Sequence, residues 1–249
     1  VTDPEVYNED AERTPRRNGP EDIRMGSYDK ETPCGTCGKS WRNNFERSCP
    51  GHFGHISLEV PVPNYLYLGG SKEPFSASPL MYAINSTCKH CSRILLDETN
   101  TVTLEEKAAA VRESNLLNTA GYDIIRKTFR SLIDKQFGLK GNRPKSLMCP
   151  HCSQISPQVR FALAPVGSFR FVFFPKEAIY DEERDEMLFF PYKEIHDWLS
   201  DIPERDALAL GFSEGSRPEN MFFTELPVIP NTARPPAQSP SGAVIPNDL

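Results

Sequence analysis

The stretch CGTCGKSWRNNFERSCPGHFGH, residues 34–55, decides how the rest of the chain is interpreted. It holds three of the seven cysteines and two of the five histidines of the 249-residue chain. Cys34 and Cys37 are separated by two residues, and Cys49 and His52 have the same spacing. Ligands at this spacing share one tight turn, so both can reach one metal ion at about 2.0–2.3 Å. The stretch therefore predicts a zinc site with the ligands Cys34, Cys37, Cys49 and His52.

His55 is the alternative histidine ligand, because it also follows the second turn. The ligand-x-x-ligand spacing favours His52 over His55. We therefore expect His55 to lie outside the coordination sphere, either hydrogen-bonded to a metal ligand or buried and hydrogen-bonded beside the site.

A second set of ligands consists of two further Cys-x-x-Cys pairs, Cys88 with Cys91 and Cys149 with Cys152. Two such pairs are the signature of a zinc ribbon, although the spacer here is long. His90 and His151 lie inside these turns, and we expect them to point away from the metal. The seven cysteines and one histidine then give two sites of four ligands, with no thiol left over.

Both predicted sites are complete with four protein ligands, which indicates structural zinc. A catalytic zinc instead keeps one coordination position open for water. The chain has no His-Glu-x-x-His pattern, which would favour a metal-dependent hydrolase, and no Gly-x-x-x-x-Gly-Lys phosphate loop. Each ion is expected to replace part of the hydrophobic core that loop-rich segments lack.

The composition favours long loops and a modest core: 38% of the residues are hydrophobic, 25% are charged and 23 are proline. The odd number of cysteines does not fit a closed disulfide framework, so we expect a reducing, intracellular environment. No apolar run reaches the roughly 18 residues of a membrane helix, so no membrane association is expected. The polar start VTDPEVYNED has no apolar region of the kind that signal peptides carry.

The net charge of −6 argues against a protein that covers nucleic acid with its whole surface. The charge is uneven, however, because residues 121–152 contain seven basic and two acidic residues. Such a run most often forms a solvated face, and the alternative is a contact surface for nucleic acid or a protein factor. The basic residues are Arg126, Lys127, Arg130, Lys135, Lys140, Arg143 and Lys145.

The periodicity of apolar residues and the positions of proline and capping residues predict the remaining helices and strands. Alternating apolar residues predict a half-buried edge strand over 56–62, and Pro79 begins a predicted short helix over 79–86. A Thr103–Glu106 capping box and an apolar stripe over 122–137 predict a helical insertion at about 103–137. The β-rich runs 169–174 and 187–190 predict a hairpin, over about 169–190, with a long acidic loop. Short helices are predicted at 193–199 and 203–211.

The predicted organisation has three parts. Residues 1–33 are expected to be an extended arm that gains structure by docking. Residues 34–226 are expected to form the zinc-binding domain, and residues 227–249, with six prolines, a Pro-rich connector. The predicted fold class is α+β, a loop-rich, zinc-stabilised module with short helices and small antiparallel sheets.

One string, Cys49-Pro-Gly-His-Phe-Gly-His-Ile56, resembles the N-terminal part of the proteins of a known family. The motifs Arg24-Met-Gly and Cys34-x-x-Cys37, which precede it, belong to the same resemblance. That family is the largest subunit of multisubunit DNA-dependent RNA polymerase, of the archaeal and eukaryotic type. The resemblance continues in order over nearly the whole chain. It includes Arg93-Ile-Leu-Leu-Asp97, Met148-Cys-Pro-His-Cys152, Leu208–Phe212, Ser216-Arg-Pro-Glu219 and Leu226-Pro-Val-Ile-Pro230.

The resemblance implies a clamp module that holds template DNA and the RNA–DNA hybrid, with two structural Zn²⁺ that stiffen it. It implies association with the other polymerase subunits, especially the second-largest, and with initiation and elongation factors. The family's Asn-Ala-Asp-Phe-Asp-Gly-Asp loop is absent from these residues, so the segment has no catalytic residues and Mg²⁺ is expected elsewhere in the enzyme.

The expected location is the nucleus in a eukaryote, or the cytoplasm in an archaeon or a virus. The alternative interpretation is a free-standing zinc-ribbon adaptor that binds nucleic acid or a protein partner.

Overall fold

The computed structural model divides the chain into two compact units. Unit 1 consists of residues 1–59 and 224–249, and unit 2 of residues 60–223. This division differs from the predicted continuous domain over 34–226, because both ends of the chain belong to unit 1. The structure describes residues 1–10, 14–27, 30–40, 48–68, 78–114, 119–139, 146–163, 169–174, 180–181, 186–187, 189–235, 237–238 and 244–245.

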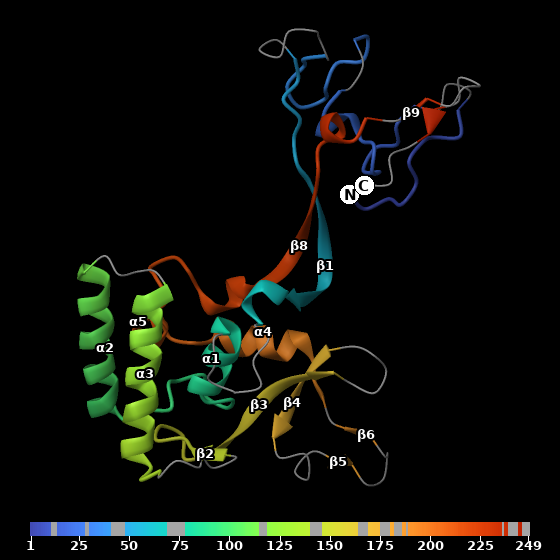
Figure 1. Ribbon diagram of the computed structural model, residues 1–249. Coiled ribbons are helices and arrows are strands. Elements are labelled where there is room, and N and C mark those ends of the chain that lie inside the picture. Colours follow the sequence, from blue (N-terminus) through green and yellow to red (C-terminus); the bar gives the residue numbers. More distant parts are fainter. Residues whose placement is uncertain are drawn as a thin grey trace. The chain divides into compact units, whose positions relative to one another are not determined.

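Unit 1 contains short elements and much irregular chain (Figure 1). The strands β1 (Gly54–Pro63) and β8 (Phe222–Val228), which both continue into unit 2, pair as a two-stranded sheet. Two single-turn 3₁₀ helices, η1 (Ile23–Met25) and η6 (Asn231–Ala233), contact each other. The short strands β9 (Ala237–Gln238) and β10 (Val244–Ile245) form a second antiparallel pair.

Unit 2 is built on an antiparallel sheet with the order β2-β3-β4-β7. Its strands are β2 (Ser146–Met148), β3 (Ile155–Leu163), β4 (Phe169–Phe174) and β7 (Phe189–Phe190). A separate pair consists of β5 (Tyr180–Asp181) and β6 (Glu186–Met187). The predicted hairpin over 169–190 is therefore present as β4 and β7, whereas β3 was not predicted.

Two hydrophobic clusters form the core of unit 2. In the first, α1 (Pro79–Ser86) and α4 (Tyr192–Ser200) pack on the sheet through side chains such as Leu80, Phe171 and Ile195. In the second, α2 (Glu98–Glu113) and α3 (Thr119–Gln136) lie side by side (Figure 1) and enclose Leu104, Phe129 and Ile133. Helix α5 (Glu204–Ala209) contacts α2. Among the described residues, no helix is long and apolar enough to cross a membrane.

Helix α2 begins five residues before the predicted start, so the capping box is wrong. The N-cap is Asp97, whose side chain accepts the Asn100 N–H at 2.8 Å. Thr103 lies inside the helix, and its hydroxyl donates to the Thr99 carbonyl at 3.0 Å. A β-hydroxyl residue fits either position, because it can bond back to the carbonyl four residues earlier.

The predicted strand over 56–62 is confirmed as β1, but its half-buried face is not. Ile56, Val60 and Val62 are 39–48% exposed. With a single partner strand, β1 has no layer of described residues that would cover one face. The predicted helices over 79–86, 193–199 and 203–211 are confirmed as α1, α4 and α5.

Candidate metal centres

Four side chains of unit 1 form the first candidate centre, site 1: Cys34, Cys37, Cys49 and His52. Their ligand atoms all lie within 4.8 Å of one another, and the sulfurs of Cys37 and Cys49 are 3.5 Å apart. These thiols form no disulfide. A tetrahedral zinc with Zn–S bonds of about 2.3 Å would hold two sulfurs about 3.8 Å apart. Site 1 therefore has the dimensions of a four-coordinate metal centre.

Backbone N–H groups are directed at the sulfurs of site 1. Thr36 N–H donates to Cys34 Sγ, and Gly51 N–H donates to Cys49 Sγ, both at 3.4 Å. Hydrogen bonds of this kind favour the thiolate over the thiol, and thiolates are what a zinc ion requires.

The ring nitrogen Nε2 of His52 is buried and has no hydrogen-bond partner among the described residues. A buried polar atom without a partner is costly, and ligation to a metal would satisfy it. This atom is the clearest sign that the residues of site 1 fit a zinc ion.

The prediction that His55 is buried is wrong. His55 is exposed on β1, and its carbonyl oxygen accepts a hydrogen bond from the Val1 ammonium. The strand begins at Gly54, directly after the metal turn, so the chain leaves site 1 before it reaches His55.

The second candidate centre, site 2, lies in unit 2 and consists of Cys88, Cys91, Cys149 and Cys152. The four sulfurs lie within 4.8 Å of one another, and two pairs, Cys88 with Cys152 and Cys91 with Cys149, are 3.6 Å apart. Cys88 and Cys149 are buried within the second hydrophobic cluster. Site 2 therefore combines metal-sized geometry with apolar packing.

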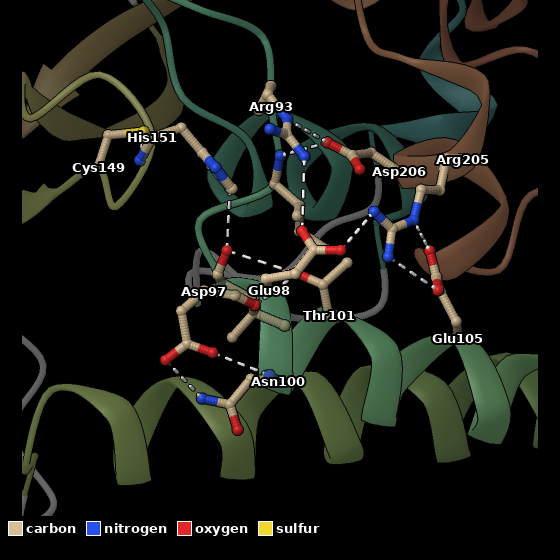
Figure 2. A network of polar contacts seen from close by, with 12 residues as sticks. Arg93, Asp97, Glu98, Asn100, Thr101, Glu105, Cys149, His151, Arg205 and Asp206 are labelled. Carbon is tan, nitrogen blue, oxygen red and sulfur yellow. Dashed lines mark hydrogen bonds and ion pairs between the residues drawn. The ribbon is translucent and has the colours of Figure 1, made fainter.

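The two histidines inside the turns of site 2 do not belong to the group of ligands. His90 is exposed. Nε2 of His151 lies 3.0 Å from the carbonyl oxygen of Leu96, and Figure 2 shows the His151 ring directed at that carbonyl, away from Cys149. His151 thereby ties the turn to the segment that leads into α2.

The three Cys-x-x-Cys turns share one backbone conformation. The residue after the second cysteine has a positive φ: 69° at Gly38, 56° at Ser92 and 58° at Ser153. Its N–H donates to the carbonyl of the first cysteine at 2.8–3.0 Å. A left-handed conformation costs a residue other than glycine on the order of 1 kcal/mol or more. Two serines held there indicate that their surroundings impose the turn.

Within each site the thiols differ in acidity. In site 1, backbone hydrogen bonds outweigh burial and lower the pKa of Cys49. Burial raises the pKa of Cys34, Cys88 and Cys91, which favours their protonated forms when no metal is bound. A hydrogen bond from the N–H of Gln154 lowers the pKa of Cys152. Because a metal has to displace the thiol protons, binding at both sites is expected to weaken as the pH falls.

Figure 2 shows a polar network that joins the first turn of site 2 to helices α2 and α5. The buried carboxylate of Asp206 accepts the Ile94 N–H at 2.9 Å and lies 3.8 Å from Arg93 Nε. Arg93 also lies 4.0 Å from Glu98, and Arg205 lies 2.6 Å from the same carboxylate. The network therefore fixes residues 93 and 94, which follow the first turn of site 2, against helices α2 and α5.

The basic residues predicted as a contact surface are only partly grouped on α3. Lys127, Arg130 and Lys135 are exposed. The side chain of Arg126 is only 16% exposed, and its guanidinium lies 3.6 Å from Asp123. Arg126 is therefore largely covered, unlike the other predicted basic residues of α3. Three further predicted residues, Lys140, Arg143 and Lys145, lie outside the described residues.

The sequence did not reveal that residues 230–234, part of the predicted connector, pack beside site 1. The buried Asn231 side chain donates to the carbonyls of Asp22 and Gly26, at 3.0 and 3.3 Å. Arg234 and Glu21 form a buried ion pair at 3.3 Å, with side chains 3% and 2% exposed. The expected connector is thus part of the folded unit.

Gly51 in the second turn of site 1 is a sequence signal for this packing. A Cβ atom there would lie 2.3 Å from the Thr232 hydroxyl and 2.6 Å from the Pro230 side chain, and its φ is +84°. Only glycine satisfies both constraints without displacing residues 230–232.

Comparisons with known proteins agree along the full chain. Residues 1–249 match the family described as RNA polymerase Rpb1, domain 1. Relatives described as DNA-directed RNA polymerase subunit Rpo1N include those of Thermococcus celer, 31% identical over 256 residues, and Methanocaldococcus jannaschii, 27% identical over 250 residues. Both alignments cover 100% of this chain, but only 24% and 16% of the respective relative. The relative from Sulfolobus acidocaldarius is 30% identical over 98% of this chain and 23% of its own length.

The chain thus spans about a quarter or less of the curated relatives that it matches. The match nevertheless includes both candidate metal centres and every described element of the two units. This chain therefore belongs to the RNA polymerase Rpb1 domain 1 family.

Proposed function

We propose that this chain is the clamp portion of the largest subunit of a DNA-directed RNA polymerase, which holds template DNA and the RNA–DNA hybrid during transcription. The observation that carries the proposal is the match of the whole chain to the Rpb1 domain 1 family. The relatives' names support the enzyme class. The catalytic Mg²⁺ and its carboxylate ligands then lie elsewhere in the enzyme. The protein is proposed to work in a reducing, intracellular environment.

We propose that sites 1 and 2 each bind one structural Zn²⁺. Each site offers four ligand atoms within 4.8 Å, which leaves no coordination position for a reacting water. The ligand sets, three thiols with one imidazole and four thiols, are those that structural zinc prefers. The ions would stabilise turns that few apolar contacts support in unit 1, and would not take part in catalysis.

We propose that the exposed bases of α3, Lys127, Arg130 and Lys135, contribute a surface for nucleic acid or for a transcription factor. They lie on one helix whose opposite face is buried by Ile125, Phe129 and Ile133. A rigid row of cations can neutralise backbone phosphates without reading a sequence.

Copurification tests the assignment to a polymerase. The tagged full-length protein, coexpressed with the second-largest subunit from the same organism, should retain that subunit through purification at moderate salt. Retention of no polymerase subunit would contradict the clamp and favour the free-standing adaptor.

Charge reversal tests the α3 surface. Lys127→Glu with Arg130→Glu should weaken binding of the assembled protein to DNA and reduce its salt dependence, by about 0.9 in log–log slope for each phosphate that is no longer neutralised. Lys107→Glu is the matched control, because Lys107 is an exposed base on the neighbouring helix α2. If the control has the same effect, or the double variant has none, the α3 surface is only a solvated face.

A further inference from the structure

The two Cys-x-x-Cys turns of site 2 are closed in different ways. The second turn, residues 149–152, ends the β2–β3 hairpin, in which three consecutive residue pairs align. The first turn, residues 88–91, follows α1 directly, and the chain beyond it is joined back through an isolated β-bridge between Thr87 and Ile94. The exit of the first turn therefore has less regular structure to hold it than the second turn has.

The hydrogen bonds on either side of this bridge determine where the Ile94 N–H points. On one side, the Cys88 N–H donates to the Arg93 carbonyl at 2.8 Å. On the other side, the Leu95 N–H donates to the Ser86 carbonyl at 2.9 Å. Hydrogen-bonded and non-hydrogen-bonded pairs alternate along antiparallel chains, so the bridge between these bonds is a non-hydrogen-bonded pair. The Ile94 N–H therefore points away from its bridge partner.

A side chain from α5 accepts this outward N–H. Ile94 is fully buried, so its N–H needs an acceptor within the protein. Oδ2 of Asp206 accepts it at 2.9 Å, from 112 positions away in the chain, and Asp206 is itself fully buried. In a continuous sheet the next strand would supply such an acceptor. Here a single carboxylate takes the place of that strand.

The helix that carries Asp206 is held on two sides. Ala207, the next residue, belongs to the first hydrophobic cluster of unit 2, and Ala209 belongs to the second. Helix α5 also contacts α2. The Asp206 carboxylate is therefore attached to a well-packed support, so it can fix the segment that it binds.

We propose that Asp206 is a positioning residue of site 2, whose carboxylate holds the first turn in the conformation that binds zinc. The turn needs such support, because Ser92 has a φ of 56°, a conformation that residues other than glycine keep only when their surroundings impose it. The Ser92 N–H donates to the Cys88 carbonyl at 2.9 Å, so this conformation shapes the ligand turn itself. The inference rests on the proposed zinc ion at site 2.

The hydrogen bond, and not the charge, is the part of Asp206 that fixes the turn. Nε of Arg93 lies 3.8 Å from the same Oδ2 (Figure 2), which is too long for a hydrogen bond, and the Arg93 side chain is 37% exposed. An asparagine at position 206 would lose the charge but keep an oxygen that can accept the Ile94 N–H. A leucine would offer no acceptor.

Alkylation of cysteines in the presence of a chelator tests this role in the full-length protein with its partner subunits. Mass spectrometry of the peptides reports sites 1 and 2 separately, so site 1 is an internal control. In Asp206→Leu the site 2 thiols should react roughly tenfold faster or more, because residues that orient ligands typically change metal affinity by about 10–100-fold. Asp206→Asn should stay within about threefold of the wild type, since it keeps the acceptor. Glu204→Gln alters an exposed acid on the same helix and should change nothing.

Amide hydrogen exchange of the same variants separates positioning from a general loss of structure. In Asp206→Leu, exchange should accelerate over residues 88–95 and stay unchanged in α2 and α3, which the second hydrophobic cluster packs. Unchanged thiol reactivity, an equal increase at both sites, or loss of protection throughout α2 and α3 would overturn the role of Asp206. An Asp206→Asn variant that reacts as fast as Asp206→Leu would overturn it as well, because the acceptor would then not matter.

The wild-type protein distinguishes this inference from the proposed zinc ion. Site 2 thiols that react equally fast with and without added zinc would contradict the metal, and with it the role of Asp206. Thiols that zinc protects equally well in the wild type and in Asp206→Leu would contradict the role of Asp206 alone.

Discussion

Sites 1 and 2 have similar Cys-x-x-Cys turns, but the residues that surround the two sites differ in polarity. Cys88 and Cys149 of site 2 belong to a hydrophobic cluster with Leu104, Phe129 and Ile133. In the described part of unit 1, few apolar side chains are buried: Met25, Cys34, Cys49 and Pro230. The surroundings of site 1 are instead polar: backbone bonds, the Asn231 side chain and a buried ion pair. The same metal turn therefore adds to a hydrophobic core in unit 2 and replaces part of such a core in unit 1.

The largest effect is expected at site 1. His52→Ala should release one zinc and unfold unit 1, because metal binding supplies folding free energy on the order of 10 kcal/mol in small zinc domains. Zinc content and hydrogen exchange of residues 14–59 measure this. His55→Ala is the matched control and should keep both ions, since His55 is exposed. A His52→Ala protein with two bound ions and native exchange in unit 1 would show that the site is not structural.

A smaller structural effect is expected at site 2. Cys149→Ser should also release one zinc, but faster exchange should be confined to the turns and to β2 and β3, because the apolar cluster keeps α2 and α3 packed. Met148→Ser changes the neighbouring residue, which is 60% exposed, and should leave the metal in place. Loss of all protection in α2 and α3 would mean that site 2 depends on its metal as much as site 1 does.

The next effect concerns the buried ion pair beside site 1. Arg234→Met leaves the Glu21 carboxylate buried without its partner, and breaking such a pair costs about 3–5 kcal/mol. Unit 1 should therefore open more readily, as measured by hydrogen exchange and by zinc release to a chelator. Arg234→Met combined with Glu21→Leu removes both charges and should recover part of the stability. Equal destabilisation in the single and double variants would contradict a role for the pair itself.

The smallest expected effect is a difference between the two sites in how steeply their zinc affinity depends on pH. Site 2 has four thiols and site 1 has three, so zinc binding displaces up to four protons at site 2 and up to three at site 1. Between pH 7 and 8, affinity at site 2 should therefore fall more steeply on acidification, by up to about tenfold more per pH unit. Competition with a chelator at several pH values measures both slopes. Parallel slopes would mean that one site 2 thiol, such as the more acidic Cys152, is already ionised without metal.

Much of the fold could be predicted from the sequence, because interactions between residues close together in the chain determine it. The spacing of the cysteines predicted both ligand groups, and the predicted short helix over 193–199 is confirmed as α4. The failures have physical reasons. Thr103 fits a helix cap and a helix interior equally well, so the start of α2 depended on Asp97 and its tertiary setting.

Long-range partners were the part that sequence could not supply. Asn231 and Arg234 read as connector residues, because their partners near residues 20–26 lie about 200 positions away in the chain. Arg126 was predicted as one of the basic residues of a contact surface, whereas Tyr122 and Asp123 hold its side chain against the helix. For Asn231 and Arg234 the decisive contacts were ones that no local pattern encodes, whereas those of Arg126 are with neighbours three and four residues earlier on α3.

The position of residues 230–234 in the chain has a consequence for biosynthesis. All four ligands of site 1 have been translated once His52 is made, yet the segment that packs against Gly51 and Gly26 follows only after the whole of unit 2. At roughly 5–20 residues per second, the ribosome needs on the order of 10 s or more to reach that segment. During this interval the site 1 thiols of the nascent chain can bind metal, but residues 230–234 are not yet there to pack against the site. Zinc capture on the ribosome, ahead of the completed unit, would then protect these cysteines until the later segment arrives.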